Sequence, residues 1–141
     1  MRERRAELEA IHDLKVNSRW LEEKANPNSS IHDFEPSGYL GPAIDDVEDI
    51  RACDAFVLFS IDGEIATKRG GRHWETGFAY GIGKSVIVCG PKENIFHFLP
   101  DVKVCATFEE TKQELLKLRY ERSKQQLNYE VYGTATSSGR L

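Results

Sequence analysis

The chain has 141 residues, of which 40% are hydrophobic, and it carries a formal net charge of −4. This length and apolar content suffice for one domain with a hydrophobic core and are too small for two ordinary domains. The acidic balance argues against a sequence-independent binder of polymeric nucleic acid, which needs a basic surface. A small-molecule partner is therefore the better expectation.

The cysteines, histidines and hydropathy predict a cytoplasmic protein. Cys53, Cys89 and Cys105 are odd in number, widely spaced and in or beside apolar segments, which indicates buried thiols in a reducing compartment. The histidines show no metal-ligand spacing, so we expect no metal. The glycine-rich string has the spacing of neither GxGxxG nor a P-loop, so we expect no cofactor. No apolar stretch approaches the ~20 residues that cross a bilayer, so no membrane partner is expected.

The first forty residues are expected to hold a helix, a strand and a long loop. Residues 1–11 contain no Gly or Pro and are rich in Arg, Glu, Ala and Leu, which is typical of a solvent-facing helix. Residues 14–20 alternate apolar and polar side chains and favour a short strand. Residues 22–41 are polar and contain several Pro, Gly, Asn and Ser residues, so we expect a long mobile loop of the kind that often serves a site.

The middle of the chain alternates helices with buried strands. Pro42 sits where a first-turn proline belongs, and apolar residues follow it at three-residue spacing, which predicts a helix. Residues 55–59, AFVLF, form a continuous apolar run that is typical of a strand buried on both faces. Residues 72–81 predict a helix that Gly83 ends, and residues 85–89, SVIVC, predict a second buried strand.

The C-terminal part adds an edge strand and a long helix. Residues 102–105 favour a strand at the edge of the sheet. Thr107 followed by Glu110 makes a capping box, which predicts the start of a long amphipathic helix. We expect residues 1–132 to form one α/β domain and the small, polar residues 133–141 to form a flexible tail.

Strands that alternate with helices at this spacing indicate a single doubly wound parallel sheet, flavodoxin-like or Rossmann-like, with helices on both faces. In that class, ligands bind beyond the carboxyl ends of the strands. We therefore expect the site in the loops after Trp20, Phe59 and Cys89. Arg19, Trp20 and Asn94 lie in or beside these loops and are candidate substrate-binding residues, with Trp20 suited to stacking on a base.

Residues 69–84, RGGRHWETGFAYGIGK, combine a basic glycine pair with a single carboxylate behind a buried strand. Gly70 and Gly71 let the backbone approach a ligand closely and leave amide groups pointing outward where the helix begins. Glu75 falls near the first turn, where the helix dipole favours an ionised carboxylate. An ionised carboxylate in a cleft can attack the anomeric carbon of a sugar and trap an oxocarbenium-like centre.

The segment GGRHWETGFAYGIGK resembles the helix motif of the nucleoside 2-deoxyribosyltransferase family, which includes 2'-deoxynucleoside 5'-phosphate N-hydrolase and CMP N-glycosidase relatives. The similarity continues through DDVEDIRACDAFVLF upstream and GPKENIFHFLPDV downstream, and so covers residues 16–104. The resemblance implies a two-step displacement in which Glu75 attacks the sugar, the base leaves, and water or a second base resolves the glycosyl-enzyme. Asp45 matches the family aspartate that contacts the sugar or handles protons on the base, and Asp46 is close enough in register to be that residue instead.

The sequence also departs from the family. Family members begin with a strand that lies in the middle of the sheet, and the resemblance starts after it, so the first strand is expected to be missing from the chain. Residues 127–132, LNYEVY, alternate in polarity and are the unassigned strand candidate. Family members also borrow residues from a neighbouring subunit, which implies a homodimer or a higher homo-oligomer.

Basic residues around the glycine pair bear on the substrate. Lys68, Arg69 and Arg72 favour a nucleoside monophosphate, because a neutral nucleoside offers them no charge. Arginines in an exposed loop can equally be solvated bystanders. The expected partner is therefore a nucleoside or a nucleoside monophosphate. We expect Arg69, Gly70, Gly71 and Arg72 to bind it. Asp46 also binds it if Asp45 is the aspartate that handles protons.

Each catalytic candidate has a structural alternative. Glu75 could be a surface glutamate favoured by the helix dipole, and Asp45 and Asp46 could be first-turn acids that stabilise their own helix. His73 lies about 100° around the helix from its neighbours, so we interpret it as a structural or substrate-edge residue and not as a base.

Four residues of the same helix are expected to serve packing. Trp74 and Phe78 lie on one side and are expected in the core rather than in a base-stacking platform. Gly77 and Gly81 are expected to let the helix approach the sheet closely. Three functional hypotheses result: an enzyme that cleaves an N-glycosidic bond, a nucleotide-binding module with a degenerate active site, and a domain-swapped structural oligomer with no affinity for nucleotides.

Overall fold

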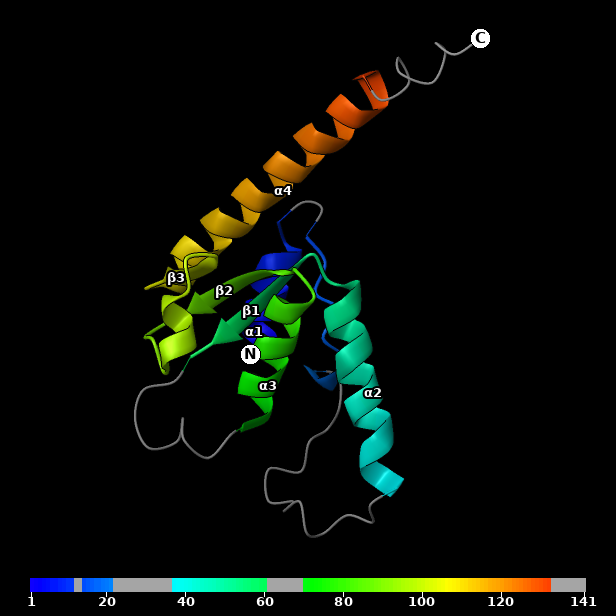
Figure 1. The fold of residues 1–141 in the computed structure, drawn as a ribbon, viewed down its shortest axis with the longest axis vertical. Coiled ribbons are helices and arrows are strands. Elements are labelled where there is room, and N and C mark those ends of the chain that lie inside the picture. The colour runs from blue at the N-terminus through cyan, green and yellow to red at the C-terminus, as the bar shows by residue number, and fades with distance from the viewer. Residues whose placement is uncertain (12–13, 22–36, 61–69, 133–141) are drawn as a thin grey trace.

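Three short apolar segments form a parallel sheet (Figure 1). The structure, a computed structural model, describes residues 1–11, 14–21, 37–60 and 70–132. The strands are β1 (Ala55–Phe59), β2 (Ser85–Cys89) and β3 (Val102–Cys105), in the spatial order β1-β2-β3. In register, Phe56 of β1 lies opposite Val86 of β2, which in turn lies opposite Val102 of β3. The strands predicted at residues 55–59, 85–89 and 102–105 are confirmed.

The core lies between the sheet and two helices, α2 (Ser37–Ala52) and α3 (Gly70–Gly81). Ile50 of α2, Ala79 of α3 and Val86 of β2 form a buried cluster, and Phe56 and Phe78 pack against it. β2 is buried over four of its five residues, whereas β1 is mostly half-buried. This difference follows from position, because β2 has a strand on each side and β1 has one on a single side within the described residues.

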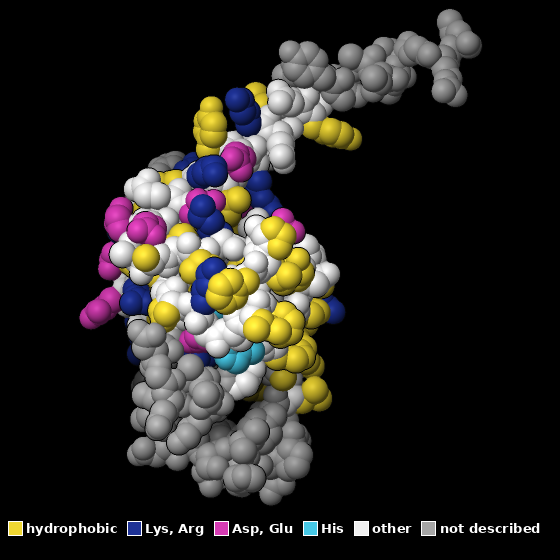
Figure 2. Space-filling model, turned by 60° about the vertical axis from the view of Figure 1, so that its left-hand side comes forward, with side chains coloured by type: hydrophobic (Ala, Val, Ile, Leu, Met, Phe, Trp, Pro, Cys, Tyr) yellow, Lys and Arg dark blue, Asp and Glu magenta, His cyan; other side chains and the backbone are white. Residues whose placement is uncertain are grey.

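The last helix, α4 (Phe108–Tyr132), begins at the predicted cap. The Glu110 amide donates to Thr107 Oγ1 at 3.2 Å, while the Glu110 carboxylate accepts from the Ala106 amide at 2.7 Å. Residues 127–132 continue this helix, so their interpretation as a strand candidate is wrong. They contain no Gly or Pro that would end a helix. Residues 121–130 are exposed, and the end of α4 stands clear of the body (Figure 2).

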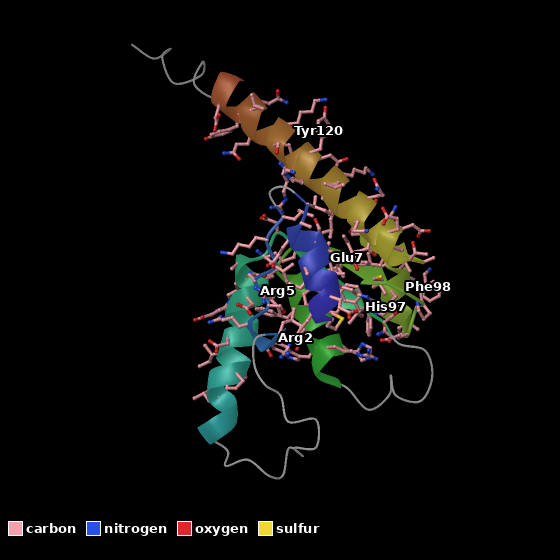
Figure 3. All side chains as sticks on the ribbon, turned by 180° about the vertical axis from the view of Figure 1, so that it is seen from behind. Arg2, Arg5, Glu7, His97, Phe98 and Tyr120 are labelled. Atoms are coloured by element: carbon pink, nitrogen blue, oxygen red, sulfur yellow. The ribbon has the colours of Figure 1, made fainter. Side chains whose placement is uncertain are left out.

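The opposite face of the sheet is covered by α1 (Arg2–Glu9) and the first turns of α4, which lie side by side when the molecule is seen from behind (Figure 3). The rings of Phe59 and Phe108 are 5.8 Å apart, and the Arg4 guanidinium lies over the Phe59 ring at 4.6 Å. The chain therefore has a Rossmann-like α/β fold with helices on both faces of a parallel sheet, and the predicted fold class is confirmed.

The segment before α2 differs from its prediction. Residues 14–18 form no strand, and Arg19–Leu21 form a short 3-10 helix, η1. A strand needs a hydrogen-bonding neighbour, and this segment is instead fixed to α2 by side chains. The Asn17 amide donates to the Asp49 carbonyl at 2.9 Å, and the Arg19 amide donates to the Asp49 carboxylate at 2.8 Å.

Helix α2 begins earlier than predicted, at Ser37, so Pro42 lies inside the helix and not in its first turn. The prediction of a long loop over residues 22–41 is therefore wrong for residues 37–41, which belong to α2. Residues 22–36 and the expected tail lie outside the described residues.

The three cysteines are free thiols, with Cys89 and Cys105 buried and Cys53 half-buried. Among the helices of the described residues, none is long and apolar enough to cross a membrane.

Candidate functional site

The carboxyl ends of β1 and β2 meet at Ser60 and Gly90. The Ser60 amide donates to the Cys89 carbonyl at 3.0 Å, and the Gly90 amide donates to the Cys105 carbonyl at 2.8 Å. Gly90 has φ of +117°, and a Cβ added there would lie 2.5 Å from Ser60 Oγ. Only glycine meets both conditions without a shift of Ser60. This close contact brings the segments after β1 and β2 to one edge of the sheet.

Helix α3 begins at this edge with the exposed residues Gly70 and Gly71, two residues before its predicted start at Arg72. Thr76 and Ala79 are buried and hold the helix to the sheet, and Thr76 Oγ1 donates to the Arg72 carbonyl at 2.6 Å. Glu75 lies one turn below the helix start and is half-buried. Its distance along the helix from Gly70 is about 7–8 Å at 1.5 Å per residue.

Burial raises the pKa of the Glu75 carboxyl, and the negative charge of Asp46 on α2 raises this pKa further. The sequence led us to expect the opposite influence, a helix dipole that favours the ionised form. Glu75 lies beyond the first turn of α3, where the effect of the helix dipole on a charge is already weak. Loss of hydration therefore determines the direction in which its pKa shifts. Glu75 and Asp46 therefore form a pair of mutually influencing carboxyl groups between α3 and α2.

Arg19 joins η1 to the acidic side of α2. Its guanidinium forms ion pairs with Asp45 at 2.7 Å, Glu48 at 3.1 Å and Asp49 at 2.8 Å, and it also donates to the Asp45 carbonyl at 2.8 Å. Asp45 is thus ion-paired with Arg19, while the neighbouring Asp46 exerts its charge on Glu75. Of the two aspartates that the sequence left open, Asp46 is the one coupled to Glu75.

Arg72, another predicted substrate-binding residue, pairs with Glu93 from the segment after β2. Their closest atoms, Arg72 Nη2 and Glu93 Oε1, are 3.0 Å apart, and the two side chains are 13% and 4% exposed. His73 Nε2 lies 3.7 Å from the other oxygen of Glu93. The Arg72 charge is therefore largely balanced within the protein.

Asn94 lies in the same cluster and begins the 3-10 helix η4 (Ile95–Phe98). Its Oδ1 accepts from the Phe96 amide at 2.9 Å, and its Nδ2 lies 3.3 Å from His73 Nδ1. His97 is 1% exposed, and its Nδ1 accepts from the Glu93 amide at 3.2 Å. Burial lowers the pKa of His97, which favours the neutral ring. Sequence reasoning did not single out Glu93 or His97, although both fall inside the segment GPKENIFHFLPDV that carries part of the resemblance.

The packing roles expected for α3 are partly wrong. Trp74 is 57% exposed and stacks on Phe78, with ring centroids 5.3 Å apart, whereas Phe78 does pack against the core. Gly77 and Gly81 are exposed, and a Cβ at either would meet nothing within 4 Å, so they do not bring the helix close to the sheet. Thr76 and Ala79 occupy the buried face instead.

The predicted site residues thus divide into three groups. Glu75 and Asp46 interact between α3 and α2, Asp45 is held by Arg19, and Arg72 and Asn94 belong to the cluster with Glu93. Arg69 and the side chain of Trp20 lie outside the described residues. Within the part of the chain that the structure describes, no group of three His, Cys, Asp or Glu residues could hold a metal ion.

Comparisons of the chain with protein-family models, with curated proteins and with solved structures found no match.

Proposed function

We propose that the chain cleaves the N-glycosidic bond of a nucleoside or nucleoside monophosphate through a covalent intermediate on Glu75. The observation that carries the proposal is the coupled pair Glu75 and Asp46, half-buried on two helices beside the carboxyl ends of the strands. Ligands bind at this edge in doubly wound folds. Enzymes that cleave glycosidic bonds with a covalent intermediate also use two carboxyl groups, one that attacks the sugar and one that transfers a proton.

The roles follow from the environments of the two groups. The Glu75 carboxylate attacks the anomeric carbon, and the base leaves with the electron pair of the broken C–N bond. Asp46 supplies or accepts the proton that the leaving base and the incoming water or second base require. Asp46 is preferred to Asp45 for this role because its charge acts on the Glu75 carboxyl group.

The ion pair between Arg72 and Glu93 bears on the substrate. Because a buried carboxylate already balances Arg72, this arginine gives little reason to prefer a phosphorylated substrate. Both nucleosides and their monophosphates therefore remain in the proposal. The resemblance to the nucleoside 2-deoxyribosyltransferase family leads us to propose also that the protein is a cytoplasmic homo-oligomer that needs no cofactor.

The test is release of free base from a panel of nucleosides and their monophosphates, followed by liquid chromatography. We expect the wild type to release base and Glu75→Gln, which keeps the shape of the side chain, to release none. Asp46→Asn should slow release more than the matched neighbour Asp45→Asn. Intact-mass spectrometry should detect a glycosyl adduct on the wild type and none on Glu75→Gln. Base release that survives in Glu75→Gln would overturn the role of Glu75.

A second candidate is a nucleotide-binding module without turnover. It is favoured by the position of β1, which has no strand on its outer side within the described residues, where the family's first strand would lie. This module would bind nucleotides with equal affinity as wild type and Glu75→Gln and would release no base in either form. Isothermal titration of both proteins with the same panel separates it from the enzyme.

A further inference from the structure

The ring of Trp74 is exposed, although the sequence predicts a place in the core for it. The indole stacks on the ring of Phe78, one turn further along α3, with ring centroids 5.3 Å apart and ring planes 8° apart. Trp74 is nevertheless 57% exposed. One face of the indole is therefore covered by Phe78, and the other face is open within the described residues.

The open face of the indole points toward the beginning of α3. Residues four apart on a helix follow one another along its axis at about 6 Å, which is close to the 5.3 Å between the two ring centroids. The rings are therefore stacked along the helix, with Phe78 on the C-terminal side of Trp74. The uncovered face of Trp74 is turned toward the edge of the sheet where doubly wound folds bind ligands.

Gly70 leaves the next place in this stack empty. It lies four residues before Trp74, so a side chain at this position would lie over the open indole face. Glycine has no such side chain, and a Cβ built at Gly70 would meet no described atom within 4 Å. The helix thus carries one aromatic ring at position 78, a second at position 74 and free space at position 70.

The lower ring of the stack is fixed by its surroundings. Phe78 packs against the buried cluster between the sheet and the two helices. The guanidinium of Arg51 on α2 lies over the Phe78 ring, 5.7 Å from its centroid. Trp74 therefore rests on a ring that has little freedom to move. A ring that is already held in place loses little conformational entropy when a ligand covers it.

The stack borders the candidate catalytic pair. Helices α2 and α3 lie side by side and run in the same direction (Figure 1). Arg51 of α2 reaches Phe78. Asp46, which lies earlier on α2, acts on Glu75, which lies earlier on α3 than Phe78. Glu75 and the adjacent Trp74 therefore border the same space beside α2.

We propose that Trp74 is the platform on which the base of the substrate stacks. This role rests on the proposed function, and it names the residue that recognises the leaving base. A base is a flat π system like the rings of the stack, and it takes the free place over Trp74 as the third member. The sugar then lies toward Glu75. Every base has a π face, so the platform accepts purines and pyrimidines alike.

Binding to Glu75→Gln, which lacks the attacking carboxylate, tests the platform apart from turnover. Isothermal titration measures the affinity of this parent for a panel of nucleosides and nucleoside monophosphates. Adding Trp74→Leu should raise the dissociation constant about 5-fold to 150-fold, the range for the loss of one stacked base, whereas Trp74→Phe should keep most of the affinity. Tyr129→Leu removes a ring of α4 that is 79% exposed and is the matched control, expected to bind like the parent. Circular dichroism checks the fold of each variant.

Tryptophan fluorescence locates the bound base. The chain has two tryptophans, Trp20 and Trp74. A base stacked on Trp74 should quench the fluorescence of the parent, and Trp74→Phe should abolish this quenching while it retains binding. A merely structural role of Trp74 would not separate these two readouts. Quenching that persists in Trp74→Phe would place the base at Trp20 and would overturn the proposal.

Gly70→Phe gives an independent measurement. Its ring should take the free place over Trp74 and weaken base binding at least about fivefold, without unfolding the chain, because a Cβ at this position meets open space. Gly81→Phe, at the other end of α3, also places its Cβ in open space and is the matched control, expected to bind like the parent.

The outcomes for Trp74 and for the glycosidic chemistry are distinguishable. Unchanged affinity in folded Trp74→Leu or folded Gly70→Phe, or a parent that binds no member of the panel, would overturn the role of Trp74. Binding that depends on Trp74, in a chain whose wild type releases no base, would support the platform and overturn the glycosidic chemistry.

Discussion

The ion pair between Arg72 and Glu93 makes a quantitative prediction about stability. The two side chains are 13% and 4% exposed and are 3.0 Å apart at their closest atoms. Glu93→Gln keeps the volume of the side chain and removes its charge, so the guanidinium stays in the same poorly hydrated place. Removing one partner of a buried pair costs about 3–5 kcal/mol. Because domains of this size are stable by about 5–15 kcal/mol, we expect Glu93→Gln to lose at least about a fifth of the stability of the wild type.

Urea unfolding followed by circular dichroism measures this loss, and a double variant that removes both charges gives the control. Arg72→Met combined with Glu93→Leu removes both charges and keeps apolar volume, and such replacements are often close to neutral. The double variant should therefore be more stable than Glu93→Gln alone. If Glu93→Gln unfolds within about 1 kcal/mol of the wild type, below the ordinary cost of a lost buried partner, water reaches the pair and the argument from burial is wrong.

Four further predictions concern the site and the fold. Glu75→Gln should be more stable than the wild type at neutral pH, because ionisation of the buried Glu75 carboxyl costs the wild type stability. This difference should be absent at a pH below the ordinary pKa of a carboxyl group and should grow as the pH rises through the raised pKa of Glu75. Unfolding curves at several pH values measure it. Asp46→Asn should lower the pKa of Glu75, and so move the acid limb of base release to lower pH, since an ionised Glu75 is the attacking form. Gly90→Ala should lower the thermal midpoint, at a cost of about 1–3 kcal/mol for the strained φ alone, and its Cβ would also meet Ser60. Thr107→Ala should cost about 1 kcal/mol by removing the cap of α4, whereas Thr107→Ser should retain most of it.

The predictable part of the fold is the part in which local pattern and tertiary contact agree. The continuous apolar runs of β1 and β2 demand burial on both faces, and the sheet supplies it. The alternation in residues 14–20 satisfies the pattern of a strand, but a strand also needs a neighbour, and Asn17 and Arg19 attach this segment to a helix instead. Alternation in residues 127–132 likewise yields to the uninterrupted helix that precedes it.

The sequence predicts where the candidate site lies, but it does not predict which charged side chains interact there. The motif places Glu75 on α3 beside the carboxyl ends of the strands, and this follows from the order of strand, loop and helix. Adjacent residues of a helix point about 100° apart, so the choice between Asp45 and Asp46 depends on how α2 packs against α3. Arg72 and Glu93, which form an ion pair, are twenty-one positions apart in the chain, so no local sequence pattern predicts their contact.

The contrast among the charged groups is itself an argument for function. The charges of Arg19 and Arg72 are matched by carboxylates, so these groups serve the fold. Glu75 differs, because within the described residues no cation or hydrogen bond offsets its burial, and the charge of Asp46, which also acts on it, has the same sign as its own ionised form. A glutamine of the same shape would relieve the cost. A carboxyl group in such a place, at the edge of the sheet where doubly wound folds bind ligands, is what the chemistry proposed for Glu75 needs.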